Sequence, residues 1–171
     1  MVDMSLIKQT ATALVAKLRA GELTPHDLLE ALEARVSEVD SKVNALPTLC
    51  FDRARSHADE LLNIPAGKRG LLSGLPVPIK DLADVEGVRS TQGSLIFENT
   101  VPTVSDVLVS HLEAEGAVVS ANSNTPEFGA GANKFNEVFG PTLNPWNTTR
   151  SAAGSSGGAA VALATGMAWV A

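Results

Sequence analysis

The sequence predicts an α/β fold, and three observations lead to this prediction. Apolar residues recur at helical spacing through residues 1–65, which we expect to form a helical entry. Two short apolar runs, 75–79 and 117–121, suit buried strands, and a helical pattern lies between them. Strand–helix–strand order is typical of layered α/β architectures. We therefore expect residues 66–171 to form an α/β core that continues the helical entry without an internal domain boundary.

The helical entry is expected to hold three helices. One face of the first helix, which ends before Gly21, carries Ile7, Ala11, Leu14 and Leu18. The second helix begins at Thr24, which is followed by a proline at the first helical position and by an acid three residues after the cap. The third helix is expected over residues 51–62.

The α/β core is expected to bring a lysine to the end of a strand. Prolines exclude helix from 75–79, so this run is interpreted as an edge or terminal strand that ends at Lys80. Ser105 and Asp106 are placed to cap a helix that runs to Glu115.

Composition and charge exclude several classes of function. The chain of 171 residues is 44% hydrophobic and 19% charged, which is typical of a globular protein. A net charge of −6 without a run of lysine or arginine argues against direct nucleic-acid binding. The sequence also lacks an apolar stretch of about 18 residues and a secretory signal, so we expect no membrane span and a cytoplasmic location.

The residues that usually hold metals are scattered. Cys50 is the only cysteine, which excludes an internal disulfide and a cysteine-based zinc site, and we interpret it as a small buried residue. The histidines His26, His57 and His111 share no spacing typical of ligands. We therefore expect no metal site.

A loop rich in glycine and serine is the most informative segment. Ser155 and Ser156 lie between Gly154 and two further glycines, and an alanine-rich run follows. This pattern predicts a tight loop that opens a helix, whose first N–H groups lack intrahelical partners. A plain linker is one alternative. A phosphate-binding loop is another, but it requires a lysine after the glycines, and none is present here.

Lys80 is the second candidate for chemistry. Residues at strand ends commonly form sites in α/β folds. Apolar neighbours such as Ile79 and Leu82 would desolvate Lys80 and lower its pKa, so that it could act as a neutral base. The alternative is a surface lysine paired with Asp81. A neutral lysine and a serine such as Ser155 would form a proton relay.

Five motifs follow one another along the chain in an order that is specific for one family. They are Gly21-Glu22-Leu23-Thr24, Gly74-Leu75-Pro76-Val77-Pro78-Ile79-Lys80-Asp81, Asn124-Thr125-Pro126-Glu127-Phe128, Asn144-Pro145-Trp146-Asn147 and Gly154-Ser155-Ser156-Gly157-Gly158. On these motifs the chain closely resembles the N-terminal part of the amidase signature enzymes, which are serine amidohydrolases with a Ser–Ser–Lys triad. The resemblance implies a mixed β-sheet core covered by helices.

The resemblance also implies roles for the candidate residues. Lys80 matches the triad lysine that finally accepts the proton, and Ser155 matches the bridging serine. Gly154 and Ser156 would support them, with a cis peptide bond between Gly154 and Ser155. Ala153 departs from the motif, which usually carries glycine at that position.

The implied activity is hydrolysis of a carboxylic amide to an acid and an amine or ammonia. In this family the acylated serine lies roughly two dozen residues past the bridging serine, and covalent catalysis requires it. The chain ends at Ala171, so we expect an N-terminal fragment that lacks this nucleophile and is inactive alone. The expected partner is a small amide, and no cofactor is implied.

Two alternatives to a stand-alone amidase remain, one within the family and one without catalytic activity. One is the amidotransferase subunit that supplies ammonia to misacylated tRNA together with partner chains, although residues 124–147 look more like the stand-alone amidases. The other is a non-catalytic truncated product. We also expect the apolar segment 161–170 to be exposed in a fragment, which leaves a homo-oligomer open.

Overall fold

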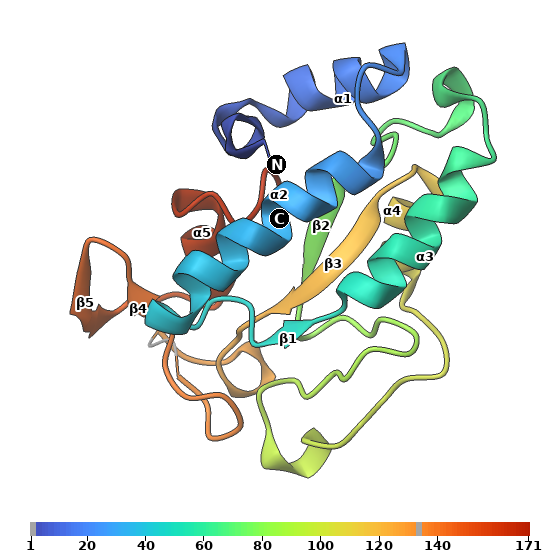
Figure 1. Ribbon diagram of the computed structural model, residues 1–171. Helices are drawn as coiled ribbons and strands as arrows, with labels where there is room; N and C mark the ends of the chain where they lie inside the picture. The colour runs from blue at the N-terminus through green and yellow to red at the C-terminus, as the bar shows by residue number, and fades with distance from the viewer. Residues whose placement is uncertain (1–2, 133–134) are drawn as a thin grey trace.

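A small mixed sheet forms the centre of the molecule. The computed structural model describes residues 3–132 and 135–171 (Figure 1). The sheet has the strand order β1–β3–β2, with β1 spanning Thr48–Leu49, β2 Pro76–Lys80 and β3 Val118–Ser123. Strand β2 runs parallel to β3, whereas β1 runs antiparallel to it. The expected mixed sheet is thus confirmed, and β2 lies at its edge as its prolines require.

The helical entry contains α1 (Ala11–Ala20), α2 (Pro25–Val39) and α3 (Phe51–Leu62). The prediction that Ile7 belongs to the first helix is wrong, because Ile7 lies in a separate 3-10 turn, η1 (Met4–Lys8). The hydroxyl of Thr10 accepts a hydrogen bond from the backbone N–H of Ala13, so a new helix starts there.

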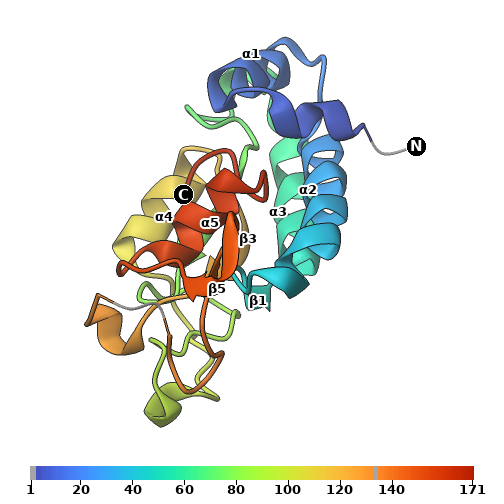
Figure 2. The same cartoon turned by 90° about the vertical axis from the view of Figure 1, so that its left-hand side faces the viewer.

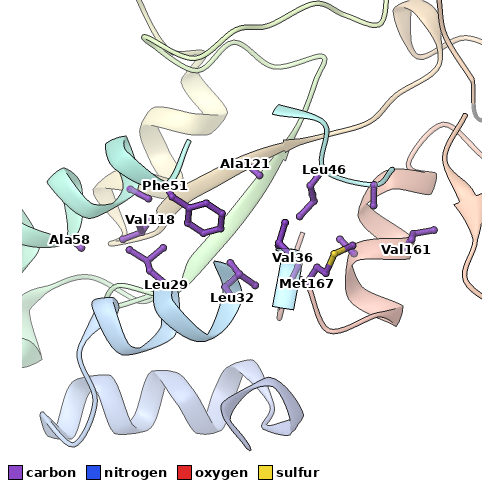
Figure 3. Packing of buried hydrophobic residues seen from close by; sticks show 14 of the residues in the cluster. Leu29, Leu32, Val36, Leu46, Phe51, Ala58, Val118, Ala121, Val161 and Met167 are labelled. Carbon is purple, nitrogen blue, oxygen red and sulfur yellow. The ribbon is translucent and has the colours of Figure 1, made fainter. Parts of the chain in front are cut away.

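Helices cover both faces of the sheet. Figure 2 shows the sheet between α2 and α3 on one side and α4 (Val107–Ala114) on the other. Neighbouring residues of β3 serve the two faces, because side chains alternate along a strand. Val118 packs with α2 and α3, whereas Val119 packs with Val109 of α4. Figure 3 shows the first of these clusters, in which Phe51 lies close to Val118.

The crossover from β2 to β3 runs through α4, and its start differs from the prediction. Asp106 occupies the N-cap position, but its side chain makes no capping hydrogen bond. Its carboxylate accepts instead from the backbone N–H of Asp84 at 2.9 Å, and the hydroxyl of Ser105 accepts from that of Glu86 at 2.9 Å. Both side chains therefore fasten the loop that follows β2.

The last part of the chain holds a hairpin and a helix. Strands β4 (Leu143–Asn144) and β5 (Asn147–Ser151) pair antiparallel and lead to α5 (Gly157–Ala164). The expected exposure of 161–170 is wrong for much of the segment, because Val161 and Met167 are buried against the cluster that contains α2. Leu163 and Val170 are exposed.

Short 3-10 turns occupy several connections: η2 (Asp40–Lys42), η3 (Ala66–Lys68), η4 (Leu95–Phe97) and η5 (Glu127–Gly129). Among the described residues, no helix has the length and apolar character needed to cross a membrane.

Candidate active site

The candidate site lies where β2 ends. Lys80 is the last residue of β2 and pairs with Ser123 of β3. Its Nζ donates hydrogen bonds to the Oγ of Ser155 and to the Oγ of Ser156, each at 3.1 Å. Lys80 and Ser155 are 75 positions apart in the sequence, so only the fold brings them together. This contact between Lys80 and Ser155 is one that the predicted proton relay requires, whereas the catalytic roles of the two residues remain a prediction.

The serine loop is shaped by two successive left-handed residues. Ala153 has φ of 57° and Gly154 has φ of 69°. The left-handed region favours glycine, which explains why the motif usually has glycine where this chain has Ala153. The backbone N–H of Gly154 donates to the carbonyl of Ala132 at 2.7 Å. The backbone of Gly154 thus ties the serine loop to Ala132, whereas its supporting role in catalysis stays a prediction.

The prediction of a cis peptide bond between Gly154 and Ser155 is wrong. The described part of the chain contains no cis peptide bond. The consecutive left-handed conformations of Ala153 and Gly154 turn the chain instead. This turn brings the hydroxyls of Ser155 and Ser156 to Lys80 with trans bonds throughout.

Helix α5 begins directly after the serines and is held by a close backbone contact. A Cβ on Gly158 would lie 2.6 Å from the backbone N and O of Asn124, so this position requires glycine. Asn124 is itself buried, and its Oδ1 accepts from Nδ2 of Asn136 at 2.7 Å. The end of β3 therefore fixes where α5 and its preceding serines lie.

The ammonium of Lys80 is partly withdrawn from water. Desolvation lowers the pKa of Lys80, as the apolar flanking residues predicted. The alternative of a surface lysine paired with Asp81 is wrong, because Asp81 is fully buried and its carboxylate bonds to Thr91. Within the part of the chain that the structure describes, Lys80 forms no ion pair.

Asp81 and Thr91 are polar residues of the site region; sequence reasoning offered Asp81 only as a counter-ion of Lys80 and gave Thr91 no role. The backbone N–H of Thr91 donates to Oδ1 of Asp81 at 2.8 Å, and the Thr91 hydroxyl donates to Oδ2 at 2.5 Å. Burial raises the pKa of Asp81, and the hydrogen bonds from Thr91 and the next two backbone amides oppose that rise. The position of Asp81 next to Lys80 was the only signal in the sequence.

The residues that could bind metals do not converge. Within residues 3–132 and 135–171, no group of three or more His, Cys, Asp or Glu side chains is placed to hold a metal ion. Cys50 is half-buried, and burial raises the pKa of its thiol to about 12.

The chemistry that the site can perform is proton transfer. The amine of Lys80 and the hydroxyls of Ser155 and Ser156 form a short path for a proton.

Known proteins resemble this chain over nearly its whole length. The profile of the Amidase family matches residues 27–171. The A subunit of the glutamyl-tRNA(Gln) amidotransferase from Shouchella clausii (strain KSM-K16) is 39% identical over 163 residues, which are 95% of this chain and 34% of that protein.

Two solved structures share the fold. One, of 6-aminohexanoate cyclic dimer hydrolase complexed with substrate, has a TM-score of 0.85 at 31% identity and covers 95% of this chain and 33% of its own. The other, a fatty acid amide hydrolase, has a TM-score of 0.90 at 25% identity, and the match covers 98% of this chain and 30% of that protein. The chain spans about a third of the length of the curated relatives that it matches. With its family profile and its mixed sheet, it belongs to the amidase family.

Proposed function

We propose that the whole protein hydrolyses carboxylic amides and that this chain supplies the proton relay. The observation that carries the proposal is the approach of Lys80 Nζ to Ser155 Oγ and Ser156 Oγ at 3.1 Å each. A lysine of lowered pKa can take up a proton near neutral pH more readily than an ordinary one, because more of it is neutral. The fatty acid amide hydrolase, whose structure shares the fold of this chain, supports the proposal.

The proposed reaction uses Lys80 in its neutral form. A serine attacks the amide carbonyl and passes its proton to Ser155, whose own proton moves to Lys80. The tetrahedral intermediate then collapses, and the proton returns through Ser155 to the leaving nitrogen. Water hydrolyses the acyl-enzyme by the same relay. In the structure the Nζ of Lys80 lies 3.1 Å from both hydroxyls, which is within reach for each proton transfer between Lys80 and Ser155.

We place the attacking serine outside residues 1–171, in the larger part of the amidase fold. The support is the coverage of about a third of each relative together with the roles that Lys80 and Ser155 take in the family pattern. On this view, residues 1–171 form one part of a single amidase domain, and the chain alone does not turn over amides. A small-molecule amide is the substrate, no cofactor is needed, and the setting is cytoplasmic.

A second candidate is the ammonia-releasing chain of a tRNA-dependent amidotransferase. The observation that favours it is the identity of 36–40% to several curated proteins that are named as the A subunit of glutamyl-tRNA(Gln) amidotransferases. Ammonia would then be released from glutamine and passed to a partner chain. The two candidates share the relay of Lys80 and Ser155 and differ in the amide that is cleaved.

The test is to supply the rest of an amidase. Residues 1–171 would be joined to the remaining part of the Shouchella clausii relative, and release of ammonia or amine would be measured with aryl amides, alkyl amides and glutamine. We expect turnover by the joined protein and none by the 171-residue chain alone. Lys80→Met and Ser155→Ala should each reduce turnover by about 10²- to 10⁴-fold.

Lys42→Met is the matched control, because Lys42 is exposed and lies outside the site. Because about two thirds of the joined protein come from an amidotransferase subunit, its turnover of glutamine tests the relay and does not distinguish the two candidates. Turnover by residues 1–171 alone that Ser155→Ala abolishes would contradict the placement of the nucleophile. Full activity of the Lys80→Met variant would contradict the relay itself.

A further inference from the structure

Asp81 is a buried carboxylate without a cation. It is fully buried, and no Lys, Arg or His of the described residues forms an ion pair with it. Burying a charge without compensation is costly, so such a group is retained only where hydrogen bonds satisfy it. Here the compensation comes from one loop, residues 91–94.

The loop 91–94 is bent around that carboxylate. Gln92 has φ of 53° and Gly93 has φ of 65°, so two left-handed residues follow one another. This bend turns the backbone amides of residues 91–93 toward Asp81, whose pKa they lower. The hydroxyl of Thr91 donates to Asp81 and at the same time accepts from the N–H of Gly93 at 3.0 Å. The carboxylate therefore determines the path of the loop.

The same loop holds a second loop, residues 125–132. The carbonyl of Gln92 accepts from the N–H of Phe128 at 2.8 Å, and the hydroxyl of Ser94 donates to the carboxylate of Glu127 at 2.7 Å. A Cβ on Gly93 would lie 3.0 Å from the carbonyl oxygen of Thr125, so the two backbones are in close contact. Phe128 has φ of 50°, a conformation that needs such support.

The loop 125–132 in turn contacts both segments that build the candidate site, the chain just after Lys80 and the serine loop. A Cβ on Gly129 would lie 2.6 Å from Cδ1 of Leu82, two residues after Lys80. The carbonyl of Ala132 accepts from the N–H of Gly154 in the serine loop at 2.7 Å. Contacts thus connect Asp81 with the serine loop through both loops. The hydrogen bonds from Lys80, the residue before Asp81, to the serines complete this circuit of contacts.

We infer that Asp81 is a positioning residue, which acts through Thr91 and the loop 125–132 to hold the serine loop at the distance that Lys80 requires. Its side chain touches neither Lys80 nor the serines in any hydrogen bond of the described residues, so its effect passes through the two loops. The catalytic meaning of this role rests on the proposed function, whereas the circuit of contacts does not.

The experiment measures the exchange of individual amide hydrogens in the 171-residue chain by NMR. Thr91→Val removes the hydroxyl at nearly constant volume and keeps the backbone N–H, and Thr91→Ser is the matched control that keeps the hydroxyl. Asp81→Asn is a second variant, because its amide oxygen is a weaker hydrogen-bond acceptor than the carboxylate. We expect the amides of Phe128 and Gly154 to exchange about tenfold to a hundredfold faster in Thr91→Val and Asp81→Asn.

Two readouts separate positioning from a general structural role. The amide of Val119 in β3 should keep its rate in every variant, and Thr91→Ser should behave like the original chain. The pKa of Lys80 should return toward the ordinary lysine value in Thr91→Val, because a loosened site admits water. Equal acceleration of all amides, or an unchanged rate at Gly154, would overturn the inference.

The outcome is independent of the proposed function. In the joined protein, Thr91→Val should lower turnover while Thr91→Ser leaves it near the original level. Local acceleration of exchange together with full activity of Lys80→Met would leave the positioning of the serine loop standing and remove the proposed relay. Loss of activity in Lys80→Met with no change in exchange for the Thr91 variants would support the proposed relay and overturn the positioning role of Asp81.

Discussion

The starts of α2 and α5 use hydroxyl residues in opposite ways. At α2, the hydroxyl of Thr24 accepts from the N–H of Asp27 at 3.3 Å, and the carboxylate of Asp27 accepts from the N–H of Thr24 at 2.7 Å. This reciprocal pair is a capping box. At α5, Ser156 occupies the same N-cap position but makes no capping hydrogen bond. Its hydroxyl accepts from Lys80 instead.

The difference shows where each helix obtains its stability. A capping side chain contributes about 0.5–2 kcal/mol to a helix, and α2 has that contribution. Helix α5 forgoes it and depends on tertiary packing, through the backbone contact of Gly158 with Asn124 and the burial of Val161 and Ala162. The serine at its start is thereby available to the candidate site.

The largest expected effect comes from breaking the tertiary support of α5. Gly158→Ala places a Cβ 2.6 Å from the backbone of Asn124, which cannot move aside as a flexible side chain would. We expect the free energy of unfolding to fall by about 1–3 kcal/mol or more, measured by urea denaturation. Gly154→Ala is the comparison, since among the described residues no atom outside its chain neighbours lies within 4 Å of its Cβ. It should cost only about 1–2 kcal/mol of left-handed strain. A larger loss in Gly154→Ala would show that packing does not determine the start of α5.

A smaller effect compares the two N-cap residues directly. Thr24→Ala should lower the free energy of unfolding by about 1 kcal/mol, because the N–H of Asp27 loses its partner. Ser156→Ala should change it by less than about 0.5 kcal/mol, because no helix N–H depends on that hydroxyl. Thermal and urea unfolding of both variants would measure the difference. Equal losses would indicate that Ser156 caps α5 in solution.

The smallest expected effect is a pH dependence that arises from Lys80. Because desolvation lowers the pKa of Lys80 in the folded chain, the unfolded chain binds more protons between that pKa and the ordinary lysine value of 10.5. Stability relative to the Lys80→Met variant should therefore rise with pH through this window and be constant below it. Urea midpoints of both proteins at several alkaline pH values would show this. A relative stability that falls in the window would mean that a carboxylate raises the pKa of Lys80.

Local chemistry alone determined several of the regular elements. The third helix was predicted over 51–62 and spans Phe51–Leu62, and the cap at Thr24 was predicted from residues within three positions of it. The strand that ends at Lys80 followed from its prolines and apolar residues. These features depend on spacing and on hydrogen bonds between near neighbours, and a sequence displays both directly.

Only the tertiary structure decided how the polar residues of the loops are used. Ser105 and Asp106 have the residue types of a helix cap but bond to the loop after β2. Asp81 follows Lys80 as a counter-ion would, yet its partner is Thr91, ten positions away. The choice of partner depends on which groups burial brings together, because a buried polar group takes the partner that is nearest in space. The sequence by itself determined α2, α3 and the strands β2 and β3, whereas packing determined the start of α5 and which polar residues of the candidate site meet.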